Sequence, residues 1–202
     1  NGHLTLPNGV YFDGSDFTVT AWVRKVANNS WSRLFDFGNG QANQNVLVGL
    51  TNGTTGRPAS QIYNGAVGGP TLTSVSVLPN NQWQLLTYTW SNGGGQLFIN
   101  GELVAQGPQT APNNVIRTLN YIGRSNWASD GFANAGLDDF RMYNRLLTPE
   151  EIRLMTVEQP SALQVSLENA QICSGQTNSI LLQNTQPGLV YQLRLNSNST
   201  NV

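Results

Sequence analysis

Residues 17–23, Phe-Thr-Val-Thr-Ala-Trp-Val, alternate strictly between the two faces of an extended chain. The odd-numbered residues are apolar, and the Thr, Thr and Trp between them point the other way. A period of two is typical of a β-strand with one buried face. Turn signals separate this run from similar ones, notably the Gly-rich residues 91–95 and Asn100-Gly101, because Asn and Gly tolerate positive φ. Short strands with frequent turns predict an antiparallel sandwich or jelly roll.

One helix is predicted beside these strands. Thr148-Pro-Glu-Glu151 combines an N-cap Thr, a Pro at the first helical position and a Glu three residues after the cap. We expect a short helix from there to about Met155. The other predicted strands cover residues 33–37, 45–50, 60–63, 83–90, 96–99, 102–105, 120–122 and 137–143.

The chain divides into two parts by pattern. Residues 1–157 hold the strands and the helix, residues 158–162 read as a linker containing Gln-Pro-Ser, and residues 163–202 change character. Three strands are predicted in this last part, at 163–167, 179–183 and 189–195. About 40 residues cannot close a two-sheet core alone, so we expect a second β-domain that is only partly present, or strands that dock on the first domain.

Low charge excludes several function classes. Only 10% of the residues are charged and the net charge is −1, against roughly 25% charged residues in ordinary domains. A nucleic-acid partner is not expected, because there is no excess of Lys and Arg to form a basic patch. Membrane insertion is not expected either, because no run approaches the roughly 18 apolar residues of a span.

Several stretches in order resemble the laminin-G-like, concanavalin A-like lectin and glucanase family in its bacterial form. The resemblance covers roughly residues 4 to 156 and implies a two-sheet antiparallel jelly roll. Residues 163–202, with Ile172-Cys-Ser-Gly-Gln176, resemble the opening of an immunoglobulin-like repeat of bacterial surface proteins. The first resemblance rests on Val10-Tyr-Phe-Asp-Gly-Ser-Asp16, Trp31-Ser-Arg-Leu-Phe-Asp-Phe-Gly-Asn39, Asn81-Gln-Trp-Gln-Leu-Leu-Thr-Tyr88, Leu97-Phe-Ile-Asn-Gly-Glu-Leu-Val104, Ile122-Gly-Arg-Ser-Asn-Trp127 and Gly136-Leu-Asp-Asp-Phe-Arg-Met-Tyr143.

Catalytic machinery is not apparent in the sequence. Glycosidases need a pair of carboxylates at a defined spacing. The glucanases that share this fold carry Glu-x-Asp-x-x-Glu on one strand, and this chain has no such pattern. Its one histidine, His3, lies at the N-terminus, so nucleophilic triads also lack their base. We therefore predict that the domain is not an enzyme, with a glycan hydrolase or lyase as the weakest of three hypotheses.

Aspartates suggest a structural calcium ion. The resemblance implies that the loop holding Asp13 and Asp16 lies beside the strand holding Asp138 and Asp139, and Ca²⁺ takes six to eight oxygen ligands. Neighbouring residues of a strand point to opposite faces, so Asp138 is the preferred ligand, while Asp139 lies on the face of Arg141. Alternatively, residues 13–16 form only a turn.

Aromatic and amide side chains suggest a sugar site. Trp22 and Trp83 are expected in the core and Asp36 as a buried, hydrogen-bonded carboxylate, whereas loop aromatics beside Asn and Asp suit a ligand better. The alternative for Trp127 is that it covers the end of the sandwich. The candidate ligand-binding residues are Trp127, Trp31, Arg124, Asn126, Tyr63 and Trp90.

Three hypotheses of function follow. The first is a non-catalytic carbohydrate-binding or adhesion module of a larger secreted or cell-surface protein, of bacterial origin, with a structural calcium and with a glycan and neighbouring domains as partners. The second is a structural spacer or protein-interaction domain of a multidomain adhesin. The third is the hydrolase or lyase.

Overall fold

The structure, a computed structural model, describes residues 2–158, 164–167 and 179–183. The chain forms two units, residues 1–160 and residues 161–202. In the second unit, β13 (Gln164–Leu167) pairs antiparallel with β14 (Ile180–Gln183), at two of the three predicted positions. The third predicted strand, at residues 189–195, lies outside the described residues, and the immunoglobulin-like repeat stays a prediction.

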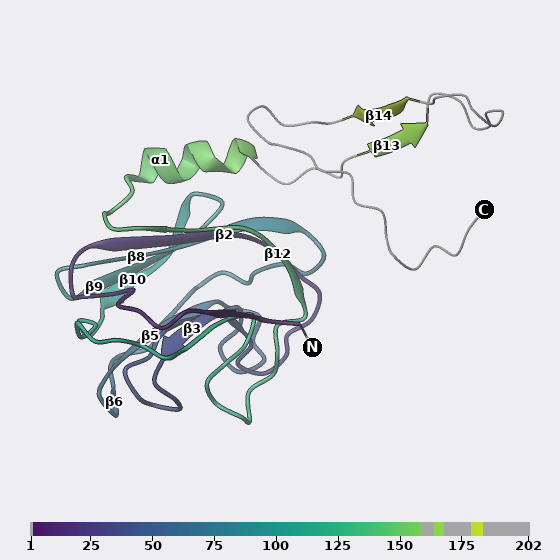
Figure 1. The fold of residues 1–202 in the computed structure, drawn as a ribbon. Coiled ribbons are helices and arrows are strands. Elements are labelled where there is room, and N and C mark those ends of the chain that lie inside the picture. The colour runs from purple at the N-terminus through teal and green to yellow at the C-terminus, as the bar shows by residue number, and fades with distance from the viewer. Residues whose placement is uncertain (1, 159–163, 168–178, 184–202) are drawn as a thin grey trace. The chain divides into compact units, whose positions relative to one another are not determined.

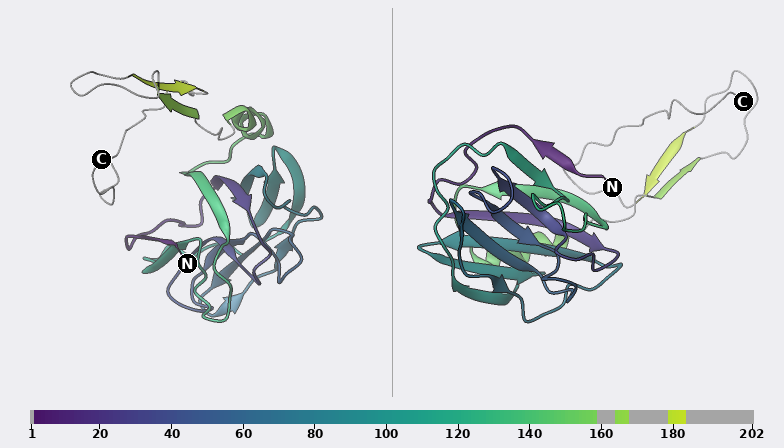
Figure 2. Two further views of the ribbon diagram at one scale, coloured as in Figure 1. Left: turned by 90° about the vertical axis from the view of Figure 1, so that its right-hand side faces the viewer. Right: turned by 90° about the horizontal axis from the view of Figure 1, so that it is seen from below.

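The first unit consists of two antiparallel sheets packed face to face, which confirms the predicted all-β jelly-roll sandwich (Figures 1 and 2). Strands distant in sequence are neighbours in both sheets, as in a jelly roll. In order across the seven-stranded sheet lie β1 (Leu4–Leu6), β11 (Leu119–Ile122), β3 (Arg33–Gly38), β4 (Val46–Gly49), β5 (Ala59–Asn64) and β6 (Val67–Gly68), with β7 (Leu72–Thr73) also on β5. The five-stranded sheet has the order β10 (Glu102–Pro108), β9 (Gly94–Ile99), β8 (Trp83–Ser91), β2 (Phe17–Lys25) and β12 (Ala135–Tyr143).

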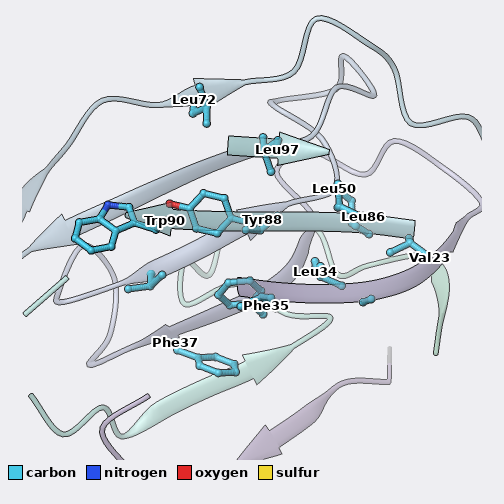
Figure 3. Packing of buried hydrophobic residues seen from close by; sticks show 14 of the residues in the cluster. Val23, Leu34, Phe35, Phe37, Leu50, Leu72, Leu86, Tyr88, Trp90 and Leu97 are labelled. Carbon is cyan, nitrogen blue, oxygen red and sulfur yellow. The ribbon is translucent and has the colours of Figure 1, made fainter. Parts of the chain in front are cut away.

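The core between the sheets follows the alternation of the sequence (Figure 3). The odd-numbered apolar residues of β2 point into it, as predicted, and meet Phe35 and Phe37 of β3 from the facing sheet. Leu86, Tyr88 and Trp90 of β8 extend the same layer. Burial of these side chains, at roughly 1.5–3 kcal/mol for a typical large apolar residue, is the main force that holds the sheets together.

The outer face of the five-stranded sheet is covered by α1 (Pro149–Leu154), which Figure 1 shows on the side away from β3 and β5. Ile152 packs there with Trp22 and Leu85, so Trp22 is buried as predicted, but beneath the helix rather than between the sheets. The predicted capping box is confirmed, because Thr148 accepts from the Glu151 N–H and the Glu151 carboxylate accepts from the Thr148 N–H.

A buried arginine joins several loops at one end of the sandwich. Arg117 is fully buried, and its guanidinium donates to the backbone carbonyls of Gln44 (2.8 Å), Phe12 (3.0 Å) and Asn113 (3.1 Å). Burial lowers its pKa to about 10. The cation therefore pairs with peptide dipoles from three separate segments.

The sequence missed β1, β6 and β7, each of two or three residues, because a run that short has no measurable periodicity. The nine strands predicted between residues 17 and 143 are all present, with bounds displaced by up to three residues. In the described part of the chain, no helix combines the length and apolar character needed to cross a membrane.

Candidate functional site

The outer face of the seven-stranded sheet carries a row of side chains from four adjacent strands. Tyr121 of β11 pairs with Asp36 of β3, Asp36 with Leu47 of β4, and Leu47 with Gln61 of β5. Because Phe35 and Phe37 point into the core, Asp36 and its partners in register point outward. The loop between β11 and β12 lies over this row.

Asp36 holds that loop on the sheet. Its carboxylate, 0% exposed, accepts from the Asn126 N–H (2.9 Å), the Asn126 side-chain amide (2.9 Å) and the Asn45 amide (2.8 Å). Burial raises the pKa of this carboxyl above its ordinary value, against the opposing effect of these donors. The prediction of a buried, hydrogen-bonded Asp36 is confirmed.

Arg33 links the same loop to the start of β3. Its guanidinium donates to the Asp130 carboxylate (2.8 Å) and lies 3.8 Å from the Asp36 carboxylate. The Ser125 hydroxyl donates to Asp130 (2.7 Å) and accepts from the Trp127 N–H (3.1 Å). The backbone of Trp127 is thus tied, through Ser125 and Asp130, to a buried cation on the sheet.

Three aromatic side chains meet around Arg33. The guanidinium carbon lies 5.5 Å from the ring centre of Trp31 and 5.6 Å from that of Trp127. The rings of Trp127 and Tyr63 lie 5.4 Å apart, tilted by 54°. All three aromatic residues are half-buried, whereas the Arg33 side chain is 5% exposed. We call Trp31, Arg33, Tyr63 and Trp127 the aromatic patch.

The backbone of Trp31 has a φ of 51°, in the left-handed region that costs a non-glycine residue about 1–2 kcal/mol. Contacts on both sides hold it there. Its N–H donates to the Gly53 carbonyl (2.9 Å), and its own carbonyl accepts from Arg33 (2.6 Å). Backbone strain of this kind is frequent at functional sites.

The loop that carries Trp31 is anchored from beneath as well. The buried Lys25 ammonium donates to the Asn28 side chain (2.6 Å) and the Gly56 carbonyl (3.3 Å), and burial lowers its pKa. The Asn29 amide reaches the Phe132 carbonyl (3.0 Å). Because three loops are bonded to one another, Trp31 and Trp127 are positioned before any ligand arrives.

The patch offers polar groups as well as ring faces. Within the described residues, the Tyr63 hydroxyl and the indole N–H groups of Trp31 and Trp127 have no hydrogen-bond partner in the protein, and none of them is a fully buried atom. Half-exposed rings with unpaired donors suit a ligand that has both an apolar face and hydroxyl groups.

The structure brings together three of the six predicted ligand-binding residues, Trp31, Tyr63 and Trp127. Asn126 lies next to them in the chain, but its amide nitrogen is used on Asp36 and on the Leu119 carbonyl (3.1 Å). Asn126 therefore positions the loop.

Trp90 does not belong to the surface. It is 3% exposed and stacks on Phe17 with ring centres 6.0 Å apart, inside the core (Figure 3). Its prediction as a ligand contact was wrong. The signal was in the sequence, because Trp90 has the same parity as Leu86 and Tyr88 on a strand whose even-numbered residues face inward.

Arg124 lies in a different group of side chains. Its guanidinium carbon is 4.6 Å from the ring centre of Tyr121 and 5.8 Å from that of Phe132, and it approaches the His3 ring nitrogen at 3.4 Å. Although Arg124 is only three residues from Trp127 in the chain, it stacks on Tyr121 and Phe132, which lie outside the aromatic patch.

The three aspartates expected to bind calcium do not fit as one site. Asp13 and Asp16 lie in a hollow beside Tyr143, which pairs with Thr18 of β2. Asp138 pairs with Trp22, which is four residues beyond Thr18 on β2. At about 3.4 Å per residue, Asp138 and Tyr143 are therefore about 14 Å apart along the sheet. In the part of the chain that the structure describes, no group of three His, Cys, Asp or Glu side chains could hold a metal ion.

Local contacts already occupy these carboxylates in part. Asp13 accepts from the Ser15 N–H (2.9 Å), which lowers its pKa, and this is the bond of a turn. Asp138 accepts from the N–H of Asp139 (2.8 Å) at a bulge in β12, and Asp139 pairs with Arg141 (2.6 Å), as the sequence suggested. The structure does not bring Asp13, Asp16 and Asp138 together, and a structural calcium ion stays a prediction.

Sequence reasoning missed Arg33 and Asp130. Both are charged residues in a chain with few charges, and each lies within three residues of a predicted tryptophan. That proximity was the available signal, but their pairing across 97 positions was not visible.

Several solved structures have a similar fold. Domain 4 of the Geobacillus stearothermophilus GH43 extracellular arabinanase AbnA, solved with arabinotriose, is 21% identical with a TM-score of 0.61, covering 76% of this chain and 72% of that one. The Ruminococcus gnavus IT-sialidase CBM40, solved with α2,3-sialyllactose, is 17% identical with a TM-score of 0.59, covering 77% and 96%. A Limulus polyphemus SAP-like pentraxin has 15% identity, a TM-score of 0.53 and coverage of 76% and 75%.

These identities show similarity of fold alone. No curated protein matches the chain significantly. The family assignment comes from the sequence, over nearly the whole of the first unit. A model of the Concanavalin A-like lectin/glucanases superfamily matches residues 1–153, about three quarters of the chain, and the chain therefore belongs to this superfamily.

Proposed function

We propose that the first unit is a non-catalytic carbohydrate-binding module and that the aromatic patch is its glycan-binding surface. The observation that carries the proposal is the meeting of Trp31, Tyr63 and Trp127, from three distant segments, as half-exposed rings around one buried cation. The C–H face of a sugar ring packs on such rings, and its hydroxyls pair with their free N–H and O–H groups. The arabinotriose and sialyllactose complexes of structurally similar domains support it.

The carboxylates near the patch favour binding over hydrolysis. Asp36 is fully buried and its oxygens accept from Asn126 and Asn45, while Asp130 accepts from Arg33 and Ser125. A glycosidase needs one carboxylic acid and one carboxylate free to reach the scissile bond. The Asp36 carboxylate cannot reach a sugar because it is fully buried, and one oxygen of Asp130 is held by Arg33 and Ser125.

The cellular setting belongs to the same proposal. The similar arabinanase domain is one part of an extracellular enzyme, and a neutral, amide-rich surface suits polysaccharide. We infer that this domain works outside the cell as an anchoring module of a larger bacterial protein, with other domains of the same polypeptide beside it.

A glycan array followed by affinity gel electrophoresis tests the function. The wild-type chain should be retarded by at least one polysaccharide, and Trp127→Ala should restore its mobility. Leu103→Ala, an exposed apolar substitution on β10 of the other sheet, is the control and should migrate as wild type. Absence of retardation across a broad panel would reject the proposal and favour the spacer hypothesis.

A further inference from the structure

A second hollow lies on the opposite side of the sandwich from the aromatic patch, beside the end of α1. It is an open depression with a volume of about 510 Å³, within the roughly 300–1,000 Å³ typical of small-molecule sites. It shares no residue with the patch. Its lining includes Trp22, Asn81, Gln82, Trp83, Gln84 and Asn100.

Every side chain that lines this hollow is uncharged. The Asn100 side-chain NH₂ donates to the side-chain amide oxygen of Gln84 (2.7 Å), and the Asn100 side-chain oxygen accepts from the Leu85 N–H (2.9 Å), so both side-chain amides are held in fixed orientations. The Gln84 NH₂ group is left to donate elsewhere. Asn81 and Gln82 are exposed, and their side chains form no hydrogen bond within the described residues. The hollow thus presents amide donors and acceptors without a net charge.

Two indole rings complete the lining. The Trp22 side chain is 2% exposed, and its buried Nε1–H has no hydrogen-bond partner in the described part of the chain. Trp83 is half-buried and its ring is backed by Gly136, where a Cβ would lie 3.2 Å from the indole. Because Gly136 has no side chain, the Trp83 ring can pack closely against its backbone.

We propose that this hollow is a second carbohydrate site, which takes neutral sugar units of an oligosaccharide. Uncharged amides match sugar hydroxyls, which donate and accept in equal measure, and the Trp83 ring supplies the apolar surface. A carboxylated or sulfated sugar would find no cation among the lining residues. The site goes beyond the function proposed for the aromatic patch and does not depend on it.

Nuclear magnetic resonance titration of the full ¹⁵N-labelled chain tests this site, with arabinotriose, cellotriose and maltotriose as probes at millimolar concentration. The Trp22 indole N–H and the Gln82 side-chain amide should shift with at least one probe, in wild type and equally in Trp127→Ala. Gln84→Ala should weaken binding at these signals by roughly five- to tenfold, the loss of about one hydrogen bond.

Trp83→Phe keeps an aromatic ring in the apolar cluster, so it should weaken binding less than Gln84→Ala does. Circular dichroism verifies that both variants are folded. Shifts that vanish in Trp127→Ala, or that Gln84→Ala leaves unaltered, would overturn the second site while leaving the patch intact. Silence of the Trp22 and Gln82 signals with all three probes would overturn it too. Conversely, if the Trp22 and Gln82 signals still shift and Trp127→Ala retains full polysaccharide binding, only the glycan-binding role of the aromatic patch is refuted.

Discussion

The carboxylate of Asp36 accepts two hydrogen bonds, each of 2.9 Å, from the backbone and the side chain of Asn126, which lies 90 residues further along the chain. This pairing holds the loop of Trp127 against the outer face of the seven-stranded sheet. The surface proposed to bind glycan is therefore built on a fully buried carboxylate.

Asp36→Ala should destabilise the domain by roughly 2–4 kcal/mol, because it leaves buried amide donors of Asn45 and Asn126 without an acceptor. Asp36→Asn keeps the shape of the side chain and one acceptor oxygen. Because burial already raises the pKa of the Asp36 carboxyl, this substitution should lower the free energy of unfolding less than Asp36→Ala does. Urea unfolding of both variants measures the order. Equal stabilities of Asp36→Ala and wild type would show that the loop is held by other contacts.

Arg117→Met should lower stability by roughly 3 kcal/mol or more, since each buried carbonyl left unpaired costs about 1–3 kcal/mol and three of them lose their donor. The matched control is Arg57→Met at an exposed position, which should stay within about 0.5 kcal/mol of wild type. Denaturant midpoints compare the two. If both variants unfold alike, the buried guanidinium does not join the loops as described.

The α1 capping box predicts a pH dependence. Hydrogen bonds from Arg145 and Thr148 lower the pKa of Glu151 from its ordinary value of 4.5 to about 2. A carboxyl with a depressed folded pKa stabilises the fold above its unfolded pKa and loses that contribution as the pH falls. The stability advantage of wild type over Glu151→Gln should therefore be present at pH 7 and shrink between pH 4.5 and 2.

Thermal unfolding at pH 7 and pH 3 measures this difference, and Glu102→Gln, on β10, controls for the loss of one surface carboxylate. A wild-type advantage that grows on acidification would contradict the role of the Glu151 carboxylate as a cap.

Calcium gives a test of the register of β12. Because Asp138 lies about 14 Å along the sheet from the segment beside Asp13 and Asp16, no calcium ion can bind all three. Any rise in melting temperature that calcium causes should be the same in Asp138→Asn as in wild type. Loss of that rise in Asp138→Asn, with retention in Glu102→Gln, would mean that the strand pairs differently.

Local signals explain which parts of the fold were predictable. The alternation of residues 17–23 and the Thr148 to Glu151 cap depend on neighbours in sequence, so the strands and α1 were predicted correctly. A bulge with positive φ at Asp139 shifts the register of β12, and no pattern in the sequence predicts it. The calcium ligands were expected together because the family resemblance implied it, whereas Asp138 pairs with Trp22, about 14 Å along β2 from the end that lies beside Asp13 and Asp16.

The candidate site was predictable only in its aromatic part. Loop position and nearby amides singled out Trp31 and Trp127, and the fold placed them together. Arg33 and Asp130, which hold the rings in place, interact across 97 residues, a relationship that the tertiary structure alone reveals. Trp90 was expected at the surface because a turn follows it, although the even-numbered residues of its strand point into the core.

Isothermal titration of the best-binding oligosaccharide into wild type, Trp31→Ala and Trp127→Ala measures directly whether the aromatic patch binds glycan. Truncating an aromatic anchor typically costs more than 1 kcal/mol, and two such residues should each weaken binding by about tenfold. Leu103→Ala should bind as wild type does. Affinities of Trp31→Ala and Trp127→Ala equal to wild type, in folded protein, would contradict a glycan-binding role of the aromatic patch.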